Sequence, residues 1–407
     1  MAFSSVQFLF IFLPLSLAVY WLLPKALRNG ALGAFSLLFF AWAGLKGAAI
    51  LLALAAITWL GGLLLEKLPR KKPLLILLIA AHLAVLAAFK YAGFAARSIN
   101  ALVPDLLPVF APALPLGISF YVFTAIGYLA DVSCGKVAAA RSPFRFFVFL
   151  AFFGHGPSGP IVRYDQQLPC LDAKAAERQV SLDRFCYGIK RFVLGLAKKA
   201  IIADQLALIY SRVTSVPAAT VPAPALVLGY LAYMMQLYFD FSGYSDMAIG
   251  IGSFFGLELP ENFNYPYLSC SVGEYWRRWH MSLSGWFRDY VYIPLGGSRC
   301  SLAKNCRNLL IVFLLTGLWH GAAWRGSMWL SVCSTACCCV WNAWACANSC
   351  SASRRSLPTL TRWWCCGSPS SFLAPTAWPR ALPRGRASCP GRAVRRATRP
   401  PPLPIPS

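Results

Sequence analysis

The sequence predicts an all-α protein with several helices that cross a membrane. Of its 407 residues, 58% are hydrophobic and only 13% are charged, whereas a typical soluble protein carries about 25% charged residues. The mean hydropathy is +0.56, and apolar runs of membrane-spanning length recur along the chain. We therefore expect a multi-pass membrane protein without a soluble domain.

Seven apolar runs are candidate membrane spans: residues 6–23, 31–43, 48–65, 73–90, 105–130, 222–240 and 308–324. The first lacks a basic start and a small-residue cleavage site, so we expect it to remain as a transmembrane helix. With the N-terminus outside, the basic clusters at 25–28, 70–72 and 136–145 all fall on one side of the membrane. The positive-inside rule identifies that side as the cytoplasm.

Two further segments do not read as spans. Residues 144–153 are apolar but too short to cross a bilayer, and Gly154-His155-Gly156-Pro157 follows them. We expect a re-entrant segment buried among helices. Residues 163–200 mix acidic and basic side chains and predict a cytoplasmic loop or surface helices.

The net charge of +24 suggests nucleic-acid binding, but its distribution argues against that class. All fourteen acidic residues lie at or before Asp289, and ten of the 38 Lys and Arg, all Arg, lie after Arg325. The remaining surplus is spread over short loops, which is typical of membrane topology. Nine of the fifteen Cys lie after residue 330, and the other six show no metal-binding spacing. We expect no nucleic-acid partner and no metal site.

His320 is the sharpest functional candidate. It ends an apolar run whose nearest charge, Arg307, lies thirteen residues earlier. At about 1.5 Å per residue His320 lies about 20 Å along the helix, within a hydrocarbon layer about 30 Å thick. A neutral imidazole at that depth can act as a general base. A histidine that merely bonds a neighbouring helix is the alternative.

His280 lies in a segment, 274–290, whose aromatic and leucine residues recur at helical spacing. We expect one amphipathic helix at the membrane interface. Arg277 and Arg278 are polar-facing and can hold a phosphate-bearing donor by charge-assisted hydrogen bonds. Simple membrane anchoring explains the same pattern.

Asp240 and Asp246 flank a small polar stretch after an apolar run. They either bond neighbouring helices or orient a catalytic group, and the structural role is favoured.

Several long strings resemble the membrane-bound O-acyltransferase family. They are Y-F-D-F-S-G-Y-S-D-M-A-I-G at 238–250, W-R-R-W-H-M-S-L-S-G-W-F-R-D-Y at 276–290 and L-W-H-G at 318–321, with P-L-G-I-S-F-Y at 115–121 and G-P-I-V-R-Y at 159–164. The resemblance runs from residue 1 to about 324. Members that acetylate an exported bacterial polysaccharide, alginate in particular, match best.

The resemblance implies a funnel of tilted helices in the bacterial inner membrane, with His320 catalytic and His280 its partner across a pore. It implies that an acetyl group from a cytoplasmic thioester such as acetyl-CoA reaches a periplasmic hydroxyl, on the polysaccharide or on a partner acetyltransferase. No cofactor stays bound. Arg277, Arg278, Trp279, Asp240 and Asp246 are the candidates for substrate or donor binding.

Other readings remain open. Relatives acylate cellulose or load D-alanine onto teichoic acid with similar motifs. A transporter or channel would need inverted repeats or paired broken helices, and the sequence shows neither. An inactive remnant of the enzyme is a third possibility.

Residues 326–407 differ from the rest, with Arg but no Lys, Asp or Glu and with abundant Cys, Trp, Ser and Pro. Reading plausible codons for 332–351 from the third base restores a leucine-rich string with acidic residues. We therefore expect a membrane-bound O-acyltransferase domain at 1–325 and a frameshifted, disordered tail at 326–407. We also expect this chain to be unstable or inactive. A divergent natural C-terminus is the alternative.

Overall fold

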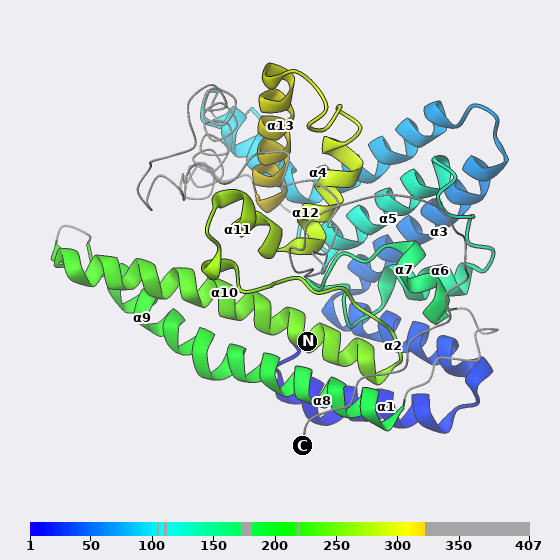
Figure 1. The fold of residues 1–407 in the computed structure, drawn as a ribbon, viewed down its shortest axis with the longest axis horizontal. Coiled ribbons are helices and arrows are strands. Elements are labelled where there is room, and N and C mark those ends of the chain that lie inside the picture. The colour runs from blue at the N-terminus through cyan, green and yellow to red at the C-terminus, as the bar shows by residue number, and fades with distance from the viewer. Residues whose placement is uncertain (104–105, 110–111, 172–180, 218–219, 322–407) are drawn as a thin grey trace, which may run out of the picture. The chain divides into compact units, whose positions relative to one another are not determined.

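The computed structural model describes residues 1–103, 106–109, 112–171, 181–217 and 220–321, all within one unit at 1–373. These residues form helices and no strand, which confirms the predicted all-α class (Figure 1). The prediction for the tail at 326–407 lies outside them. The helices are η1 (Phe8–Phe12), α1 (Leu13–Leu22), η2 (Lys25–Leu27), α2 (Arg28–Ala43), α3 (Leu45–Lys67), α4 (Lys71–Asn100), α5 (Ile118–Ser133), α6 (Pro143–Ala151), α7 (Tyr164–Leu171), α8 (Leu182–Ala197), η3 (Lys198–Ala203), α9 (Asp204–Thr214), α10 (Ala223–Phe254), η5 (Pro266–Leu268), α11 (Val272–Arg278), α12 (Met281–Phe287), η6 (Arg288–Tyr292) and α13 (Leu302–His320).

Each of the seven predicted spans coincides at least in part with a helix. Within the described residues, three helical segments are long and apolar enough to cross a membrane: Lys25–Ala43, Leu45–Lys67 and Lys71–Asn100. The predicted start of the span at 105–130 is wrong, because α5 begins only at Ile118. Prolines at 108, 112 and 115 disfavour helix there, and Gly117 adopts the left-handed conformation (φ 71°) directly before the helix.

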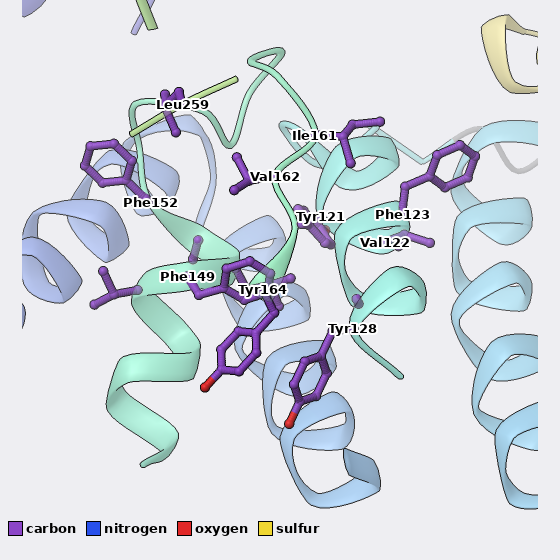
Figure 2. Close-up of a cluster of buried hydrophobic side chains, with 14 of the residues drawn as sticks. Tyr121, Val122, Phe123, Tyr128, Phe149, Phe152, Ile161, Val162, Tyr164 and Leu259 are labelled. Carbon is purple, nitrogen blue, oxygen red and sulfur yellow. The ribbon is translucent and has the colours of Figure 1, made fainter. Parts of the chain in front are cut away.

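Most of the short helix α6 is buried, as the sequence predicts for 144–153, although Phe144 in its first turn is exposed. Phe149 is 2% exposed, and the following segment with His155 is buried too. The ring of Phe149 lies 5.0 Å from that of Tyr164, which lies 5.0 Å from the ring of Tyr128 on α5. Figure 2 shows this cluster, in which aromatic side chains join α5, α6 and the segment 161–164. Aromatic pairs at these separations add stability beyond their buried area.

Helix α8 falls in the segment 163–200, where surface helices were one of the two predicted forms. It packs closely against α10 through glycines (Figure 1). A Cβ placed on Gly188 would lie 2.9 Å from the carbonyl oxygen of Gly250, and a Cβ on Gly243 would lie 2.7 Å from that of Gly195. Each helix has its two glycines seven residues apart, about two turns, so they share one face. The missing side chains let the two antiparallel backbones touch.

Candidate functional site

The chain breaks its helix at His280, so the prediction of one continuous helix over 274–290 is wrong. Helix α11 ends at Arg278, α12 begins at Met281, and His280 between them is left-handed, with φ 44° and ψ 54°. The cause is Asn262. Its carbonyl oxygen accepts the N–H of Met281 at 2.9 Å, and its Oδ1 accepts the N–H of Ser282 at 3.3 Å. These bonds replace the ones that a continuous helix would make.

The left-handed backbone at His280 costs about 1–2 kcal/mol for a residue with a Cβ. Strain of this kind tends to persist where a site requires it. Here it turns the imidazole inward, where the side chain is 2% exposed. The ring of Phe241 meets it edge-on at 4.7 Å, and the ring of Trp319 lies 6.0 Å away.

The imidazole of His280 is neutral. Burial, and then the nearby His320, lower the pKa of His280 to about 3. Its Nδ1 lies 3.0 Å from Oδ1 of Asn262, and its buried Nε2 has no hydrogen-bond partner among the described residues.

His320 is the last residue of α13 and is exposed. The carbonyl groups that end a helix need partners from outside it, and α4 provides two. The ammonium of Lys90 donates to the carbonyl of Trp319, and the hydroxyl of Tyr91 donates to that of Leu318. The Lys90 ammonium also lies 5.4 Å from the Trp319 ring centroid. A cation suits the negative end of the helix dipole, so α4 holds the end of α13 that bears His320.

Both predicted histidines line one cavity, between α11, α12 and α13. Its volume is about 30 Å³, which is enough to hold a water molecule. Most of the wall is aromatic or aliphatic, and Ser284 and Thr316 are the hydroxyl-bearing residues in it. Trp276 lines the cavity as well, and its buried indole N–H has no partner among the described residues. Such orphaned groups call for an explanation, and a ligand is one.

The aromatic and basic residues beside His280 separate in the structure. Trp279 lines the cavity and stacks on Tyr275, with centroids 5.7 Å apart. Arg277 and Arg278 are not among the lining residues. The guanidinium of Arg278 donates to Glu274 at 2.7 and 3.0 Å. Donor binding by these arginines therefore stays a prediction.

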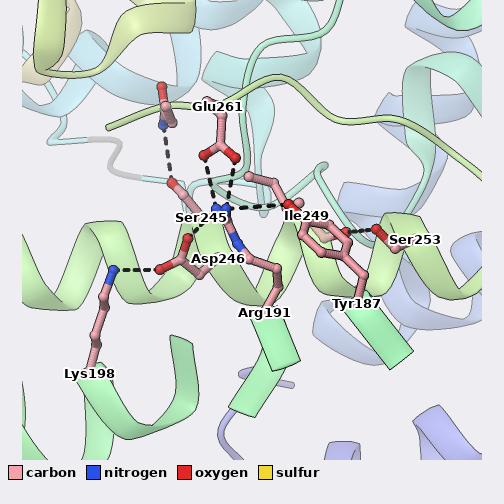
Figure 3. Close-up of polar contacts among 9 residues, drawn as sticks. Tyr187, Arg191, Lys198, Ser245, Asp246, Ile249, Ser253 and Glu261 are labelled. Atoms are coloured by element: carbon pink, nitrogen blue, oxygen red, sulfur yellow. Dashed lines mark hydrogen bonds and ion pairs between the residues drawn. The ribbon is translucent and has the colours of Figure 1, made fainter. Parts of the chain in front are cut away.

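Asp240 and Asp246 bond neighbouring helices, the role favoured from the sequence. Asp240 pairs with Lys199 at 2.9 Å. Asp246 pairs with Lys198 at 2.6 Å and with Arg191, as Figure 3 shows. A direct contact with substrate stays a prediction for both.

Arg191 extends this network toward the cavity. Its guanidinium also binds both carboxylate oxygens of Glu261, at 2.8 and 2.9 Å. Both acidic partners of Arg191 lie next to Asn262 or to a residue that it contacts. Glu261 directly precedes Asn262 in the chain. Asp246 directly follows Ser245, and the Ser245 hydroxyl accepts a hydrogen bond from the Asn262 amide at 3.2 Å. Arg191 thus ties α10 to the segment that holds His280.

Sequence reasoning missed Asn262, Arg191 and Lys90. Lys90 carried a signal, because it is a charge at the end of an apolar run. Asn262 and Arg191 carried none, because their roles depend on contacts between segments far apart in the chain. In the described part of the chain, no group of three or more His, Cys, Asp and Glu side chains could hold a metal ion.

Comparison with known proteins shows which family the chain resembles. The model of the membrane-bound O-acyltransferase family matches residues 138–341. The chain is 42% identical over 337 residues to the probable alginate O-acetylase AlgI of Azotobacter vinelandii, covering 81% of this chain and 66% of that protein. It is 33% identical over 359 residues to the peptidoglycan O-acetyltransferase of Helicobacter pylori, covering 80% and 68%.

A third relative is the teichoic acid D-alanyltransferase of Bacillus subtilis, 33% identical over 219 residues, with 51% of this chain and 54% of that protein covered. The chain thus spans about two thirds of the length of the first relatives it matches. On the family match and these identities, the chain belongs to the membrane-bound O-acyltransferase family.

Proposed function

We propose that the chain carries the acyl-transfer site of an O-acetyltransferase that serves an exported polysaccharide, most closely alginate. The observation that carries the proposal is that His280 and His320 line the same cavity. The similarity to alginate O-acetylases supports acetyl as the transferred group and alginate as the acceptor. Peptidoglycan, teichoic acid and cellulose are the alternative acceptors, the first two by similarity to a peptidoglycan O-acetyltransferase and a teichoic acid D-alanyltransferase.

The reaction follows from the chemistry of a thioester donor such as acetyl-CoA. A hydroxyl oxygen attacks the carbonyl carbon, a C–O bond forms, and the C–S bond breaks. The hydroxyl proton passes to an imidazole nitrogen and from there to the leaving thiolate. We assign the base to His320, with His280 beside it. General acid–base catalysis of this kind contributes about 10²–10⁴-fold.

The cavity wall supports this chemistry in two ways. Its apolar side chains exclude bulk water, which limits hydrolysis of the thioester. The indole N–H of Trp276, which has no partner in the described part of the chain, is a donor suited to the oxygen that gains negative charge during attack.

We propose a multi-pass protein of the bacterial inner membrane that takes the thioester from the cytoplasm. The acceptor hydroxyl is then periplasmic, on the glycan or on a partner acetyltransferase. Because a thioester with a charged carrier does not cross a bilayer, a base reached from both faces replaces transport. Arg277 and Arg278 are our candidates for the anionic part of the donor.

The test is glycan acetylation in cells that express this chain, beside a version with the reading frame restored after about residue 325. In each active version, His320→Ala is expected to reduce acetylation at least about 100-fold. His82→Gln is the control, because His82 is buried elsewhere and hydrogen-bonded to Thr58 and Leu78. Acetylation that survives His320→Ala would overturn the proposal. Equal activity of the two versions would refute the frameshift.

A further inference from the structure

Asn262 is fully buried and uses both ends of its amide. Its Nδ2 donates to Ser245 at 3.2 Å. Its Oδ1 receives the backbone N–H of Ser282 at 3.3 Å, the hydroxyl of Ser282 at 2.9 Å and Nδ1 of His280 at 3.0 Å. The side chain therefore joins α10, the break in the helix and the start of α12.

One of these contacts fixes which way the amide faces. A backbone N–H can only donate, so the atom that the N–H of Ser282 meets must be the amide oxygen. A flipped amide would set its NH₂ group against that N–H and lose the bond. The oxygen of Asn262 thus faces His280.

The orientation of Asn262 in turn fixes the proton on His280. An amide oxygen only accepts, so Nδ1 of His280 must carry the hydrogen. A neutral imidazole has one N–H, which leaves a lone pair on Nε2. That nitrogen is buried, has no partner among the described residues, and belongs to a side chain that lines the cavity.

We infer that Asn262 is a positioning residue that holds His280 as the Nδ1–H tautomer, so that Nε2 is a proton acceptor in the cavity. In this state Nε2 accepts a hydrogen bond or a proton from an O–H or N–H group that enters the cavity, and it donates to none. The catalytic consequence rests on the proposed function. The tautomer itself does not.

The tautomer is measured directly by ¹⁵N NMR of the full chain with labelled histidine, in nanodiscs at pH 7.5. The chain has four histidines, and His280→Asn, which suits a left-handed backbone, identifies the His280 signal by its loss. We expect a protonated Nδ1 and an unprotonated Nε2. A protonated Nε2 in the unaltered chain would overturn the inference.

Two substitutions test the role of Asn262. Asn262→Leu removes the acceptor and is expected to bring the Nε2–H form into the spectrum. Asn262→Asp keeps an acceptor and adds a charge, so the imidazolium form should persist to higher pH than in the unaltered chain. Ser245→Ala is the matched control, because it removes the other partner of Asn262 and should leave the Nδ1–H signal in place. If Asn262→Leu does not fold, an unshifted titration in Asn262→Asp still refutes the inference.

Activity then separates the two proposals. Asn262→Leu should lower kcat by about 10–100-fold with little change in KM, the range that follows loss of the partner that orients a metal-binding histidine. If His280 has the expected tautomer but acetylation is unaffected by His280→Asn, the proposed function fails and the inference stands. If His280→Asn abolishes acetylation but the spectrum shows Nε2–H, the inference fails alone.

Discussion

Gly250→Ala tests the close packing of α8 on α10 and, through it, the support of the cavity. The added Cβ would lie 2.7 Å from the carbonyl oxygen of Gly188 and 2.8 Å from the backbone nitrogen of Phe192. Neither backbone atom can rotate away, and ordinary contact begins about 0.6 Å or more farther out, so the helices must separate. Overpacking of this size costs about 1–3 kcal/mol.

Separation of the helices would also stretch the contact between Arg191 on α8 and Asp246 on α10. We therefore expect a Tm several degrees lower in detergent and a fall in acetylation. Gly30→Ala on α2 is the matched control, because its Cβ would meet nothing within 4 Å, and alanine is favoured over glycine in a helix by about 1 kcal/mol. A Tm for Gly250→Ala equal to or above that of Gly30→Ala would refute the argument.

Three further predictions concern Lys90, Arg191 and His280. Lys90→Met removes the cation from the carbonyl end of α13. We expect a kcat about 10-fold lower at unchanged protein level, because the helix end loses about 1–2 kcal/mol of stabilisation. An unchanged kcat would contradict this prediction. Arg191→Met leaves Asp246 and Glu261 without this partner. We expect the free energy of unfolding to fall by about 1–3 kcal/mol, between the values for exposed and buried ion pairs. An unchanged free energy of unfolding would show that Arg191 has no structural role. Because burial lowers the pKa of His280 in the folded chain, below about pH 6.5 the unfolded chain binds a proton at this residue that the folded chain does not. The Tm should therefore fall as the pH drops from about 6.5. His280→Asn should make the Tm depend less on pH in this range.

The sequence predicted most of the helices because hydropathy and length are local properties. The span at 31–43 ends at Ala43, where α2 ends. The run at 73–90 was cut short, because the hydropathy falls after Lys90 although α4 continues to Asn100. Residues 91–100 are rich in alanine, which favours helix without raising hydropathy enough to read as a span.

The two histidines of the candidate site were predictable from the sequence, but the residues that position them were not. Trp276, Trp279 and Leu283, which recur at helical spacing in the sequence, all line the cavity although the helix breaks between Trp279 and Leu283. Periodicity could not reveal the break at His280, because its cause, Asn262, lies eighteen residues earlier in a segment without regular structure. Contacts over such separations follow from the fold and not from local pattern.

The central claim is that His280 and His320 act together on one acyl group, and a double-mutant cycle tests it most directly. Transfer of radiolabelled acetyl from a thioester to glycan would be measured in membranes with His280→Asn, with His320→Ala and with both changes, at matched protein levels, in this chain and in its frame-restored version. Residues that act as a unit lose activity non-additively. We predict that the double variant is no worse than the poorer single variant. Losses that multiply, or a single variant that keeps full activity, would contradict the account.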